Sequence, residues 1–345
     1  MNNQIWFDLV HPANVHWYLD SIISLKSKGY EVICTVRDFE HLPELMDFYN
    51  ISYVLLPDEK TSSKELCMSS ITKFIKTHDI KVLITQGSYY VPSIAHKHGI
   101  KCIATVEYAD LQSRNVSTLP YSDIILLPRF YKKRDIVKQG ADPLKIIQFK
   151  SFFTAAVIFS NFVKSTDVLK MLGIENEDRL ISIRPLRIPS LFYRDLKVIY
   201  RIARTFKDVK VIVLPRDRSH ERIIQRYLLH KKIIIPSRAF DYVNLYKYSK
   251  VVVGGTVALE AALVGTIGVW SYPFNPYYKR GVSPIHKFLI KEAQLRHAYL
   301  DKSLFEELKM ALCVSKPKIS ITRLFQLLDN PNQVLIEQIE QLCQG

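Results

Sequence analysis

Cysteine and glycine are scarce in this chain, and their scarcity limits the class of protein to which it belongs. The five cysteines among 345 residues, at positions 34, 67, 102, 313 and 343, are odd in number and too widely spaced for a metal knuckle. This pattern favours a reducing compartment over a disulfide framework. With eleven glycines, sixteen prolines and 48% hydrophobic residues, the composition is typical of a packed globular protein and not of a disordered one.

Acidic residues are also in short supply. The chain has 33 Asp and Glu residues against 48 Lys and Arg, which gives a formal net charge of +15. Such a balance favours an anionic partner, namely a nucleotide, a phosphorylated lipid, an anionic membrane face or a nucleic acid. The basic residues are spread along the chain, and neither a helix-turn-helix nor an aromatic RNP pattern accompanies them. Nucleic acid is therefore the least favoured of these partners.

Long uninterrupted hydrophobic runs are absent as well. The start of the chain, "MNNQIWFDLV", lacks the cationic leader and apolar run of a signal peptide, so we expect a cytoplasmic protein. The most apolar stretch, "VVVGGTVALEAALVGTIGVW" (251–270), is interrupted by Gly254, Gly255 and Gly265. A membrane helix requires about 20 apolar residues without such breaks. The segment instead predicts a strand, a glycine turn, a helix and a second strand.

Short β-branched runs alternate with amphipathic segments throughout the sequence. The predicted strands are 4–10, 30–36, 52–56, 81–85, 101–106 and 123–128, followed by 179–184, 209–215, 231–236, 250–255 and 266–270. The predicted helices are 15–28, 41–49, 63–78, 90–98, 190–206, 219–229, 256–264, 303–314 and 320–343. Strands separated by helices of this length imply βαβ units and parallel sheets covered on both faces. We therefore predict an α/β fold with two doubly wound, Rossmann-like domains.

The length of the chain also favours two domains, because it exceeds what one hydrophobic core usually organises. The boundary is expected within 150–178, close to the apolar segment "FFTAAVIFSNFV" (152–163). We assign 1–160 to an N-terminal domain and 161–345 to a C-terminal domain. The C-terminal helices are expected to pack back on the first domain.

The glycine turn is the clearest candidate site. Gly254 and Gly255 end a predicted strand and let backbone amides approach a ligand, and Thr256 is a candidate N-cap for the helix 257–264. A helix N-terminus at the carboxyl end of a parallel strand favours anions. Glu260 lies on the same helical face as Thr256, where a carboxylate suits the paired hydroxyls of a ribose. These features describe a nucleoside diphosphate site. The alternative is a structural turn, with Glu260 directed to solvent or to a nearby Arg.

Segments from nearly the whole chain resemble one family. They are "IWFDLVHPANVHWYL", "GYEVICTVRDFEHLPELMDFYNISY", "IRPLRIPSLFY", "VIVLPRD" and "GGTVALEAALVGT". In order, they resemble the family numbered 354 among the domains of unknown function. That family lies within the superfamily of two-lobed (GT-B) glycosyltransferases and non-hydrolysing UDP-N-acetylglucosamine 2-epimerases. The resemblance implies two Rossmann-like domains that face each other across a cleft, with a nucleotide diphosphate sugar, chiefly a UDP-sugar, bound to the second domain.

The resemblance also assigns residues to this donor site. It implies that the glycine turn and Thr256 bind the diphosphate and that Glu260 binds the ribose. Arg184, in "IRPL", falls where such enzymes often place a phosphate-binding Arg, and Arg216, in "LPRD", is a second candidate. A guanidinium suits this role because it offers several donors and remains charged. An ordinary surface Arg is the alternative for both.

Polar residues follow the predicted strands of the N-terminal domain. His11 and His16 flank the turn after the first strand and are the candidate catalytic residues, because His is readily poised as a base near neutral pH. The alternatives are that His11 caps the helix and that His16 lies in the domain interface. The family often has His at position 14, where this chain has Asn. The candidate contacts to the acceptor or sugar are Asn14, Arg37, Glu107 and Asp110, for which salt bridges or helix caps are the alternatives.

The favoured interpretation is a metal-independent glycosyltransferase. An Asp-x-Asp pair is missing, so neither a metal nor another cofactor is predicted. Helix amides and Arg184 would stabilise the leaving diphosphate while an acceptor hydroxyl attacks the sugar. An epimerase is the first alternative. Its His-Arg-Arg-Glu-Asn pattern is replaced here by "IRPLRIP", but Glu107 and Asp110 would supply an acid and a base. The second alternative is a non-catalytic protein that binds a nucleotide, a nucleic acid or a membrane surface.

The acceptor class stays open between a glycan and a lipid-linked sugar. The apolar segment 152–163 and the cations Lys132, Lys133 and Arg134 suit an acceptor at an anionic membrane face. The alternative for the apolar segment is a helix packed between the domains. We expect a monomer or a homodimer.

Overall fold

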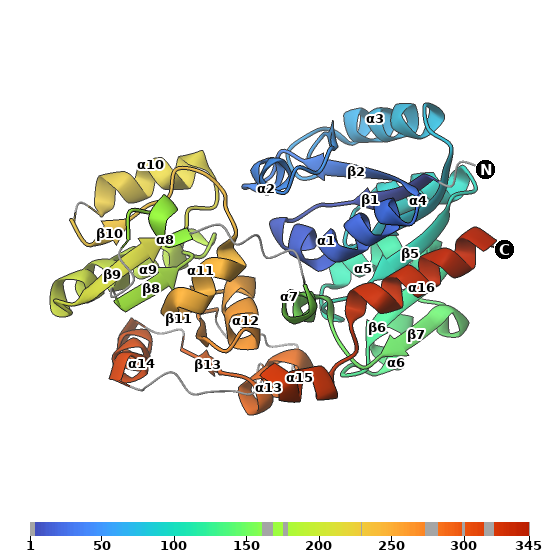
Figure 1. The fold of residues 1–345 in the computed structure, drawn as a ribbon. Helices are drawn as coiled ribbons and strands as arrows, with labels where there is room; N and C mark the ends of the chain where they lie inside the picture. Colours follow the sequence, from blue (N-terminus) through green and yellow to red (C-terminus); the bar gives the residue numbers. More distant parts are fainter. Residues whose placement is uncertain are drawn as a thin grey trace. The chain divides into compact units, whose positions relative to one another are not determined.

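The computed structural model describes residues 4–160, 168–174, 179–228, 230–272, 282–298, 301–313 and 321–344. The chain divides into two compact units. Unit 1 comprises Met1–Phe162 and Leu327–Gly345, and unit 2 comprises Val163–Gln326. In each unit, parallel strands alternate with helices (Figure 1). This arrangement confirms the predicted α/β class with two doubly wound sheets.

Unit 1 is built on a parallel sheet with the strand order β3-β2-β1-β4-β5-β6-β7. Its strands are β1 (Gln4–Asp8), β2 (Glu31–Arg37), β3 (Val54–Leu56), β4 (Ile80–Thr85), β5 (Lys101–Thr105), β6 (Ile124–Pro128) and β7 (Ile146–Phe149). Its helices are α1 (Pro12–Ser27), α2 (Leu42–Phe48), α3 (Lys64–Lys76), α4 (Val91–Lys97), α5 (Gln112–Thr118), α6 (Lys133–Val137), α7 (Ala156–Phe159) and α16 (Pro331–Gln344), with the 3-10 turns η1 (Leu119–Tyr121), η2 (Pro143–Lys145) and η3 (Phe153–Ala155). All strands run parallel, but β2 and β3 are added on one side of β1 and β4 to β7 on the other, so the strand order reverses between β1 and β4. Ligands of open α/β sheets bind at the carboxyl ends of the strands at such a reversal.

The first strand shows how unit 1 buries a polar atom inside an apolar sheet. Trp6 of β1 is fully buried, with its ring 4.9 Å from that of Phe74 of α3, measured between centroids. Its indole N–H donates to Thr35 Oγ1 of the paired strand β2 at 2.7 Å. The hydroxyl of Thr35 donates in turn to Asp8 Oδ1, also at 2.7 Å. A chain of hydrogen bonds therefore runs from the core toward the end of β1.

The apolar segment 152–163 belongs to the core of unit 1 where the structure describes it. Phe152 and Phe153 have no exposed surface, and the ring of Phe153 lies 5.6 Å from that of Tyr18 of α1. These two rings therefore stabilise unit 1 and do not form a membrane-facing surface. No helix in the described part of the chain is both long and apolar enough to cross a membrane.

The last part of the chain forms two helices where one was predicted. The prediction of a single helix over 320–343 is wrong, because α15 (Ile321–Leu327) ends before Pro331 begins α16. Proline lacks the amide that a helix interior requires but is tolerated in the first turn. Helix α16 packs on α1, where Ser21 Oγ donates to Asn332 Oδ1 at 2.5 Å.

Unit 2 contains a second parallel sheet with the order β10-β9-β8-β11-β12-β13. Its strands are β8 (Arg179–Ile183), β9 (Val209–Val213), β10 (Ile233–Ile234), β11 (Ser249–Gly254), β12 (Ile267–Trp270) and β13 (Leu295–His297). Its helices are α8 (Val168–Met171), α9 (Pro189–Thr205), α10 (Arg218–Tyr227), α11 (Tyr242–Tyr248), α12 (Thr256–Leu263), α13 (Pro284–Glu292), α14 (Asp301–Cys313) and α15. Here the reversal falls between β8 and β11, so the ends of these strands are the expected ligand position.

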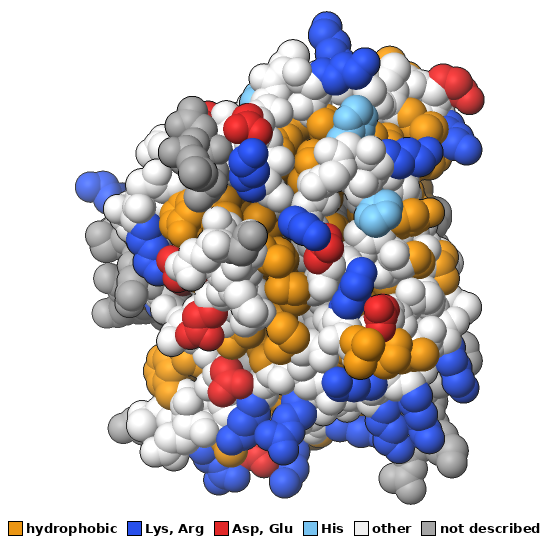
Figure 2. All heavy atoms as spheres, turned by 90° about the vertical axis from the view of Figure 1, so that its right-hand side faces the viewer, with side chains coloured by type: hydrophobic (Ala, Val, Ile, Leu, Met, Phe, Trp, Pro, Cys, Tyr) orange, Lys and Arg blue, Asp and Glu red, His pale blue; other side chains and the backbone are white. Residues whose placement is uncertain are grey.

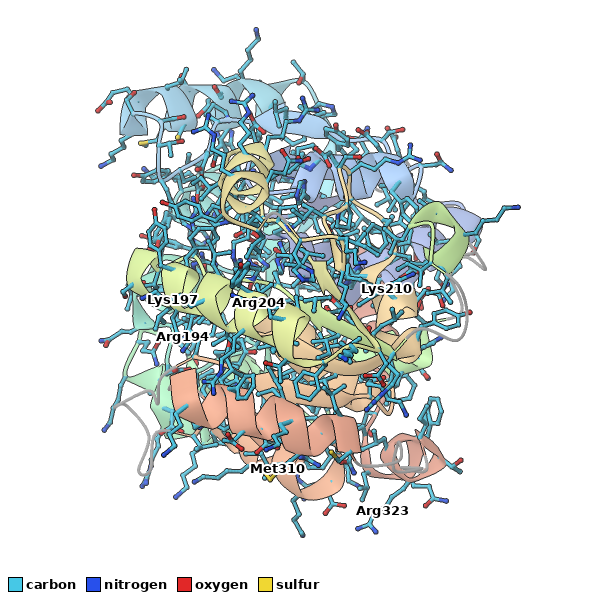
Figure 3. All side chains as sticks on the ribbon, turned by 90° about the vertical axis from the view of Figure 1, so that its left-hand side faces the viewer. Arg194, Lys197, Arg204, Lys210, Met310 and Arg323 are labelled. Carbon is cyan, nitrogen blue, oxygen red and sulfur yellow. The ribbon has the colours of Figure 1, made fainter. Side chains whose placement is uncertain are left out.

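Helix α9 illustrates the packing of this unit. Leu196 and Ile199 are buried in the core, whereas Lys197 and Arg204 are exposed on the outward side of the helix (Figure 3). This division follows the helical repeat, which places apolar residues on one face and charges on the other.

The apolar stretch 251–270 folds as predicted, into β11, a turn, α12 and β12. Helix α12 lies unusually close to β12, and Gly268 makes this approach possible. A Cβ at Gly268 would lie 1.9 Å from the carbonyl oxygen of Ala258 in α12. The position of α12 therefore depends on a glycine in the neighbouring strand.

Figure 2 shows one face of the molecule, on which several Lys and Arg side chains gather toward the lower edge and others lie apart among hydrophobic and acidic side chains.

Candidate functional site

The turn between β11 and α12 presents backbone amides at the carboxyl edge of the unit 2 sheet. Gly255 is the N-cap of α12, and Thr256 is its first residue, so the prediction of Thr256 as the cap is wrong. Gly255 lies close to the loop after β12, since a Cβ there would lie 2.8 Å from the ring of Tyr272. Gly255 and Thr256 are both partly exposed, so a ligand can reach their amides.

The amides of this turn are available for an additional acceptor. None of the described residues accepts a hydrogen bond from the backbone N–H groups of Gly255, Thr256 or Val257. The first bonded amide is that of Ala258, which donates to the Gly255 carbonyl at 2.9 Å. Unpaired amides and the helix dipole both favour an anion at such a position.

Gly254 brings this turn against the end of β8. Its φ is +155°, and a Cβ there would lie 2.6 Å from Val257 Cγ2 and 3.2 Å from the carbonyl oxygen of Arg184. The amide of Arg184 donates to the Val253 carbonyl at 2.9 Å, which fixes the start of the loop after β8 beside the turn. The two strand ends at the reversal of the sheet are therefore adjacent.

Both candidate arginines are held by this loop, and neither is an ordinary surface residue. Arg184 is 7% exposed, and its guanidinium lies 5.7 Å from the ring centroid of Tyr242. Arg216 is 8% exposed, and its Nε donates to the Pro185 carbonyl at 2.9 Å. Arg216 therefore supports the loop that carries Arg184.

Glu260 lies one helical turn further along α12 and is 2% exposed, so its carboxylate does not reach solvent. The pKa of Tyr246 lies well above its ordinary value, chiefly because the side chain is buried and secondly because of the charge of Glu260. The charge of Arg184 lowers this pKa in part. Glu260, Arg184 and Tyr246 thus share one buried environment. The hydroxyl of Tyr246, which sequence reasoning missed, is buried and bonds to none of the described residues.

A buried pair on α9 ties the loops around this site together, and it too was missed. Asp195 accepts a hydrogen bond from the Leu186 amide at 2.9 Å and pairs with Arg194 at 2.5 Å. Arg194, which projects from α9 (Figure 3), donates to the Ser271 carbonyl at 3.1 Å. The Ser271 amide donates to Gly254 at 3.1 Å. The sequence "YRDL" gives no signal for this role, because the partners are far away in the chain.

A histidine pair borders the other end of the same sheet. His286 of α13 is 4% exposed, with its Nδ1 2.5 Å from Ser283 Oγ and its ring 4.0 Å from that of Trp270. Burial, helped by the neighbouring His297, lowers the pKa of His286 to about 4. His286 is therefore neutral in the folded protein near pH 7.

In unit 1, His11 is partly exposed and caps helix α1. Its Nδ1 accepts a hydrogen bond from the Ala13 amide at 3.1 Å, while Asn14 Oδ1 accepts one from the His11 amide at 2.9 Å. The alternative of a helix cap is thus observed. Because Nδ1 accepts, the neutral ring carries its proton on Nε2 and donates there.

The neighbouring candidates are more deeply buried. Asn14 has no exposed surface, and its Nδ2 donates to Gln86 Oε1, after β4, at 3.4 Å. Asn14 therefore connects the loops after β1 and β4. His16 is 8% exposed and meets the edge of the Tyr49 ring at 6.2 Å between centroids.

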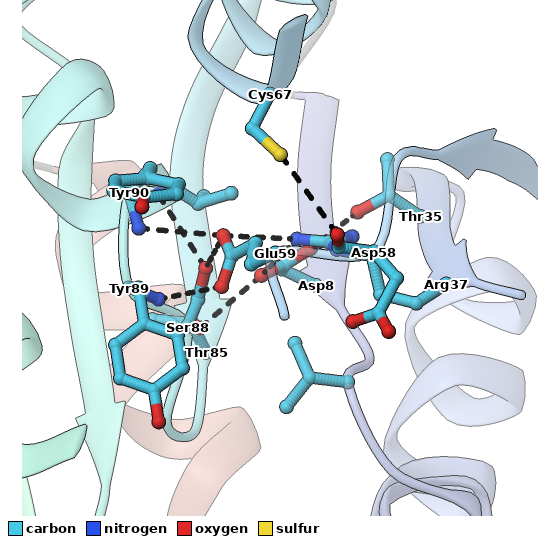
Figure 4. Close-up of polar contacts among 12 residues, drawn as sticks. Asp8, Thr35, Arg37, Asp58, Glu59, Cys67, Thr85, Ser88, Tyr89 and Tyr90 are labelled. Atoms are coloured by element: carbon cyan, nitrogen blue, oxygen red, sulfur yellow. Dashed lines mark hydrogen bonds and ion pairs between the residues drawn. The ribbon is translucent and has the colours of Figure 1, made fainter. Parts of the chain in front are cut away.

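Arg37 lies at the centre of a buried network at the carboxyl edge of the unit 1 sheet (Figure 4). It is 1% exposed, with its Nη1 2.9 Å from Asp8 Oδ1 and its Nη2 3.5 Å from Glu59 Oε1. Burial alone would lower the pKa of Arg37, but the charges of Asp8 and Glu59 outweigh it and raise that pKa. Arg37 therefore remains charged inside the protein.

Glu107 supports the backbone of unit 1. It has no exposed surface, and its carboxylate accepts hydrogen bonds from the amides of Phe153, at 2.6 Å, and Thr154, at 3.1 Å, and from the hydroxyl of Thr154. Glu107 therefore caps the backbone at Phe153 and Thr154, which corresponds to the alternative of a cap and not to a contact with a sugar. Asp110 is partly exposed in the loop between β5 and α5. Within the described residues, no group of three or more His, Cys, Asp or Glu side chains is placed to hold a metal ion.

Two parallel sheets of this order, each with its polar residues at the reversal of the strand order, define an α/β protein of the GT-B fold class. The chain belongs to the family "Protein of unknown function (DUF354)", whose model matches residues 3–343. It is 25% identical over 313 residues to the uncharacterized protein MJ0665 of Methanocaldococcus jannaschii, covering 86% of this chain and 88% of that protein.

Solved structures share the fold at low sequence identity. The UDP-GlcNAc 2-epimerase of Methanocaldococcus jannaschii, in complex with UDP-GlcNAc and UDP, is 12% identical, with a TM-score of 0.72 over 98% of this chain and 99% of that one. A glycosyltransferase from Rickettsia africae is also 12% identical, with a TM-score of 0.61 over 100% of this chain and 99% of that one. These similarities establish the fold and leave the reaction open.

Proposed function

We propose that this protein binds a nucleotide diphosphate sugar at the turn between β11 and α12, with a UDP-sugar as the favoured ligand. The observation that carries the proposal is the set of amides at Gly255, Thr256 and Val257, which lie beside Arg184 at the reversal of the sheet. A diphosphate offers enough acceptor oxygens for both groups. The preference for UDP rests on the solved structure with this fold that contains UDP-GlcNAc and UDP.

Glu260 is the proposed partner of the ribose. It follows the free amides by one helical turn, the distance that separates a phosphate from the pentose to which it is attached. A buried carboxylate can accept two hydrogen bonds from adjacent hydroxyls, whereas it would repel a phosphate. Tyr246, whose hydroxyl lies in the same buried environment, is a further proposed contact.

The proposed reaction is transfer of the sugar to an acceptor without a metal. The acceptor oxygen bonds to the anomeric carbon as the bond from that carbon to the diphosphate breaks. The hydroxyl proton passes to the leaving diphosphate or to water, and negative charge grows on the diphosphate as it leaves. Preorganised amides and a buried Arg184 stabilise that charge more effectively than water does. We propose that the acceptor binds unit 1, near His11 and Asn14 at the start of α1. The acceptor is proposed to be a glycan or a lipid-linked sugar.

An epimerase is the second candidate, favoured by the fold shared with UDP-GlcNAc 2-epimerases. Its acid and base would come from Glu107 and Asp110. However, Glu107 is fully buried and already accepts three hydrogen bonds from Phe153 and Thr154. We therefore rank the transferase first.

The proposal is tested by the effect of nucleotides on thermal unfolding. UDP-sugars should raise the unfolding midpoint, because a ligand that binds only the folded state stabilises it. Arg184→Gln should abolish most of this shift, and Arg204→Gln, which removes an exposed charge from α9 of the same unit, should not. If UDP, GDP, CMP and dTDP sugars all leave the midpoint unchanged, the proposal is wrong. Incubation with UDP-GlcNAc alone separates the two reactions, since only an epimerase forms UDP-ManNAc without an acceptor.

A further inference from the structure

A groove lies between the second half of α1 and helix α16 in unit 1. Helix α16 packs on α1 (Figure 1). The two helices and the end of α7 leave a groove of about 660 Å³, a volume typical of small-molecule sites. Asp20, which lines the groove, lies about 12 Å along α1 from the start of that helix at Pro12. All described lining residues belong to unit 1, so the groove is separate from the turn at α12.

The charge of the groove contrasts with that of the chain, whose net charge is +15. The described lining residues include the acids Asp20, Glu337 and Glu340. Lys28 is the only cation among them, and it pairs with Glu340 at 2.7 Å. The carboxylates of Asp20 and Glu337 would repel a phosphate or a carboxylate. The groove therefore favours a neutral or a cationic ligand over an anionic one.

Asp20 is a carboxylate whose burial is only partly compensated. Its Oδ1 accepts a hydrogen bond from Ser160 Oγ at 3.1 Å, and burial nevertheless raises the pKa of Asp20 to about 6. Near pH 7 such a carboxylate makes the folded protein less stable, because its charged form is better solvated in the unfolded chain. A residue that costs stability at the wall of a groove is typical of a ligand site.

Asn332 of α16 lines the same groove and retains an unused donor. The residue is 2% exposed, and its Oδ1 accepts hydrogen bonds from the amide and the hydroxyl of Ser21, at 3.2 and 2.5 Å. Its Nδ2 is buried and donates to none of the described residues. Because an unpaired buried donor is costly, it indicates a ligand atom that accepts a hydrogen bond. An ammonium group cannot accept one, so a purely cationic ligand would leave Asn332 unsatisfied.

Apolar side chains complete the groove. Ile23 of α1, Phe159 of α7 and Ile336 of α16 line it beside the polar groups. A hydroxyl group both donates and accepts, so one saccharide can donate to Asp20 and accept from Asn332. The C–H faces of its ring can be buried against the apolar side chains. A neutral saccharide therefore matches the charge, the hydrogen-bonding groups and the apolar surface of the groove.

We propose that this groove binds a neutral saccharide, with Asp20 and Asn332 as direct ligands. The inference goes beyond the proposed function and rests on it in one respect, the identification of the saccharide as part of a glycan acceptor. His11 caps the start of the same helix, so the groove and the proposed acceptor site lie along α1. The groove would then hold a part of the glycan that is distant from the reacting hydroxyl.

NMR titration of ¹⁵N-labelled protein with neutral disaccharides tests the inference. The probes are maltose, cellobiose, lactose and N,N′-diacetylchitobiose, with spermidine as the cationic comparison and glucose 6-phosphate as the anionic one. We expect at least one disaccharide to bind with a Kd on the order of 1 mM and to shift the side-chain amide signals of Asn332. Glucose 6-phosphate should leave these signals unchanged. If no disaccharide binds at about 20 mM, or if spermidine alone binds, the inference is wrong.

Variants assign the binding to this groove. Asp20→Asn should weaken disaccharide binding about tenfold, in line with one charge-assisted hydrogen bond, and should raise the unfolding midpoint near pH 7 because it removes the buried charge. The matched control, Glu65→Gln, removes an exposed carboxylate from α3 of the same unit and should change the affinity less than about twofold. Ser24→Tyr fills the groove from α1 and should abolish binding.

Three results would contradict the assignment. A lower unfolding midpoint with unchanged affinity in Asp20→Asn would show that Asp20 only supports the fold. Wild-type affinity in both Asp20→Asn and Ser24→Tyr would refute the site. A disaccharide that binds without affecting the Asn332 signals would occupy another part of the protein, which would refute the site as well.

The two proposals fail separately. If UDP does not bind but a disaccharide binds through Asp20, the proposed function is wrong and the saccharide site stands. If UDP binds and no disaccharide does, the saccharide site is wrong and the nucleotide site stands.

Discussion

Glu260→Gln is expected to weaken UDP binding strongly while leaving unit 2 folded. The carboxylate is 2% exposed, so its hydrogen bonds to a ribose would be desolvated and little screened. A charge-assisted hydrogen bond of this kind is worth about 1.5–3 kcal/mol. A loss of about 2 kcal/mol raises Kd about 30-fold. For UDP at about 100 times the wild-type Kd, the stabilisation of the folded state falls from about 2.7 to about 0.9 kcal/mol.

Urea unfolding followed by tryptophan fluorescence measures this difference, and calorimetry gives Kd directly. Trp270 is the only tryptophan in the sequence of unit 2, so it reports on the unit that carries the site. Glu306→Gln is the matched control, because it removes an exposed carboxylate from α14 of the same unit. It should leave the affinity for UDP unchanged.

Inorganic pyrophosphate gives the sharpest contrast. It lacks a pentose, so Glu260→Gln should bind it at least as tightly as the wild type does, since a nearby negative charge has been removed. If the variant loses affinity for pyrophosphate and UDP equally, Glu260 supports the diphosphate turn and does not contact a ribose. If it binds UDP with the wild-type Kd, the assignment of Glu260 is wrong.

Three further substitutions test the structure of the two units. Gly268→Ala should destabilise unit 2 by about 3 kcal/mol or more in urea unfolding, because the added methyl group meets the backbone of α12. Gly265→Ala should cost about 1 kcal/mol, because the backbone there has φ of +83° but no atom lies within 4 Å of the new methyl group. Equal losses of stability in the two variants would contradict the packing argument. The pKa of His286 is about 4 in the folded protein and 6.5 in the unfolded chain. The stability that neutral His286 contributes is therefore complete above pH 6.5, and a free energy on the order of 3 kcal/mol is lost as the pH falls toward 4. His286→Gln should flatten the pH profile of the unfolding midpoint, and an unchanged slope would exclude this titration. Arg37→Met should lower the free energy of unfolding by about 3–5 kcal/mol, because it leaves buried carboxylates without their cation. Adding Asp8→Asn should restore part of this stability. A loss of stability below about 1 kcal/mol in Arg37→Met would show that the network does not stabilise unit 1.

The strands that the sequence predicts most clearly are those buried on both faces of a sheet. The run "KVLIT" has three β-branched residues, Val82, Ile84 and Thr85, and corresponds to β4, whose residues 82–85 are all buried. In contrast, β7 was missed because Ile147 and Gln148 are exposed and only the ends of this short strand are buried. Likewise, β13 has a single fully buried residue. Edge strands lack the continuous apolar pattern on which the prediction depends.

In the candidate site, the residues that could be predicted are close together in the sequence, and the residues that were missed have partners far away in the chain. The glycine turn and Glu260 could be predicted because they are close in sequence and one helix holds them together. The cap was misplaced by one residue, and the environment of Gly255 includes Tyr272 from the loop after β12, which is distant from the turn in the sequence. Arg194 and Asp195 were missed for a similar reason: their partners at Leu186 and Ser271 become neighbours only in the folded unit.

The most direct test of diphosphate binding at α12 is the amide spectrum of protein labelled with ¹⁵N-glycine, in which eleven signals are expected. UDP should shift the signal of Gly255 most strongly, with a smaller shift for Gly254, and should leave that of Gly29 in unit 1 unchanged. Arg184→Gln should reduce the shift at a given UDP concentration. If UDP binds and neither Gly254 nor Gly255 responds, the diphosphate is not held by the amides of this helix, and the proposed nucleotide site is wrong.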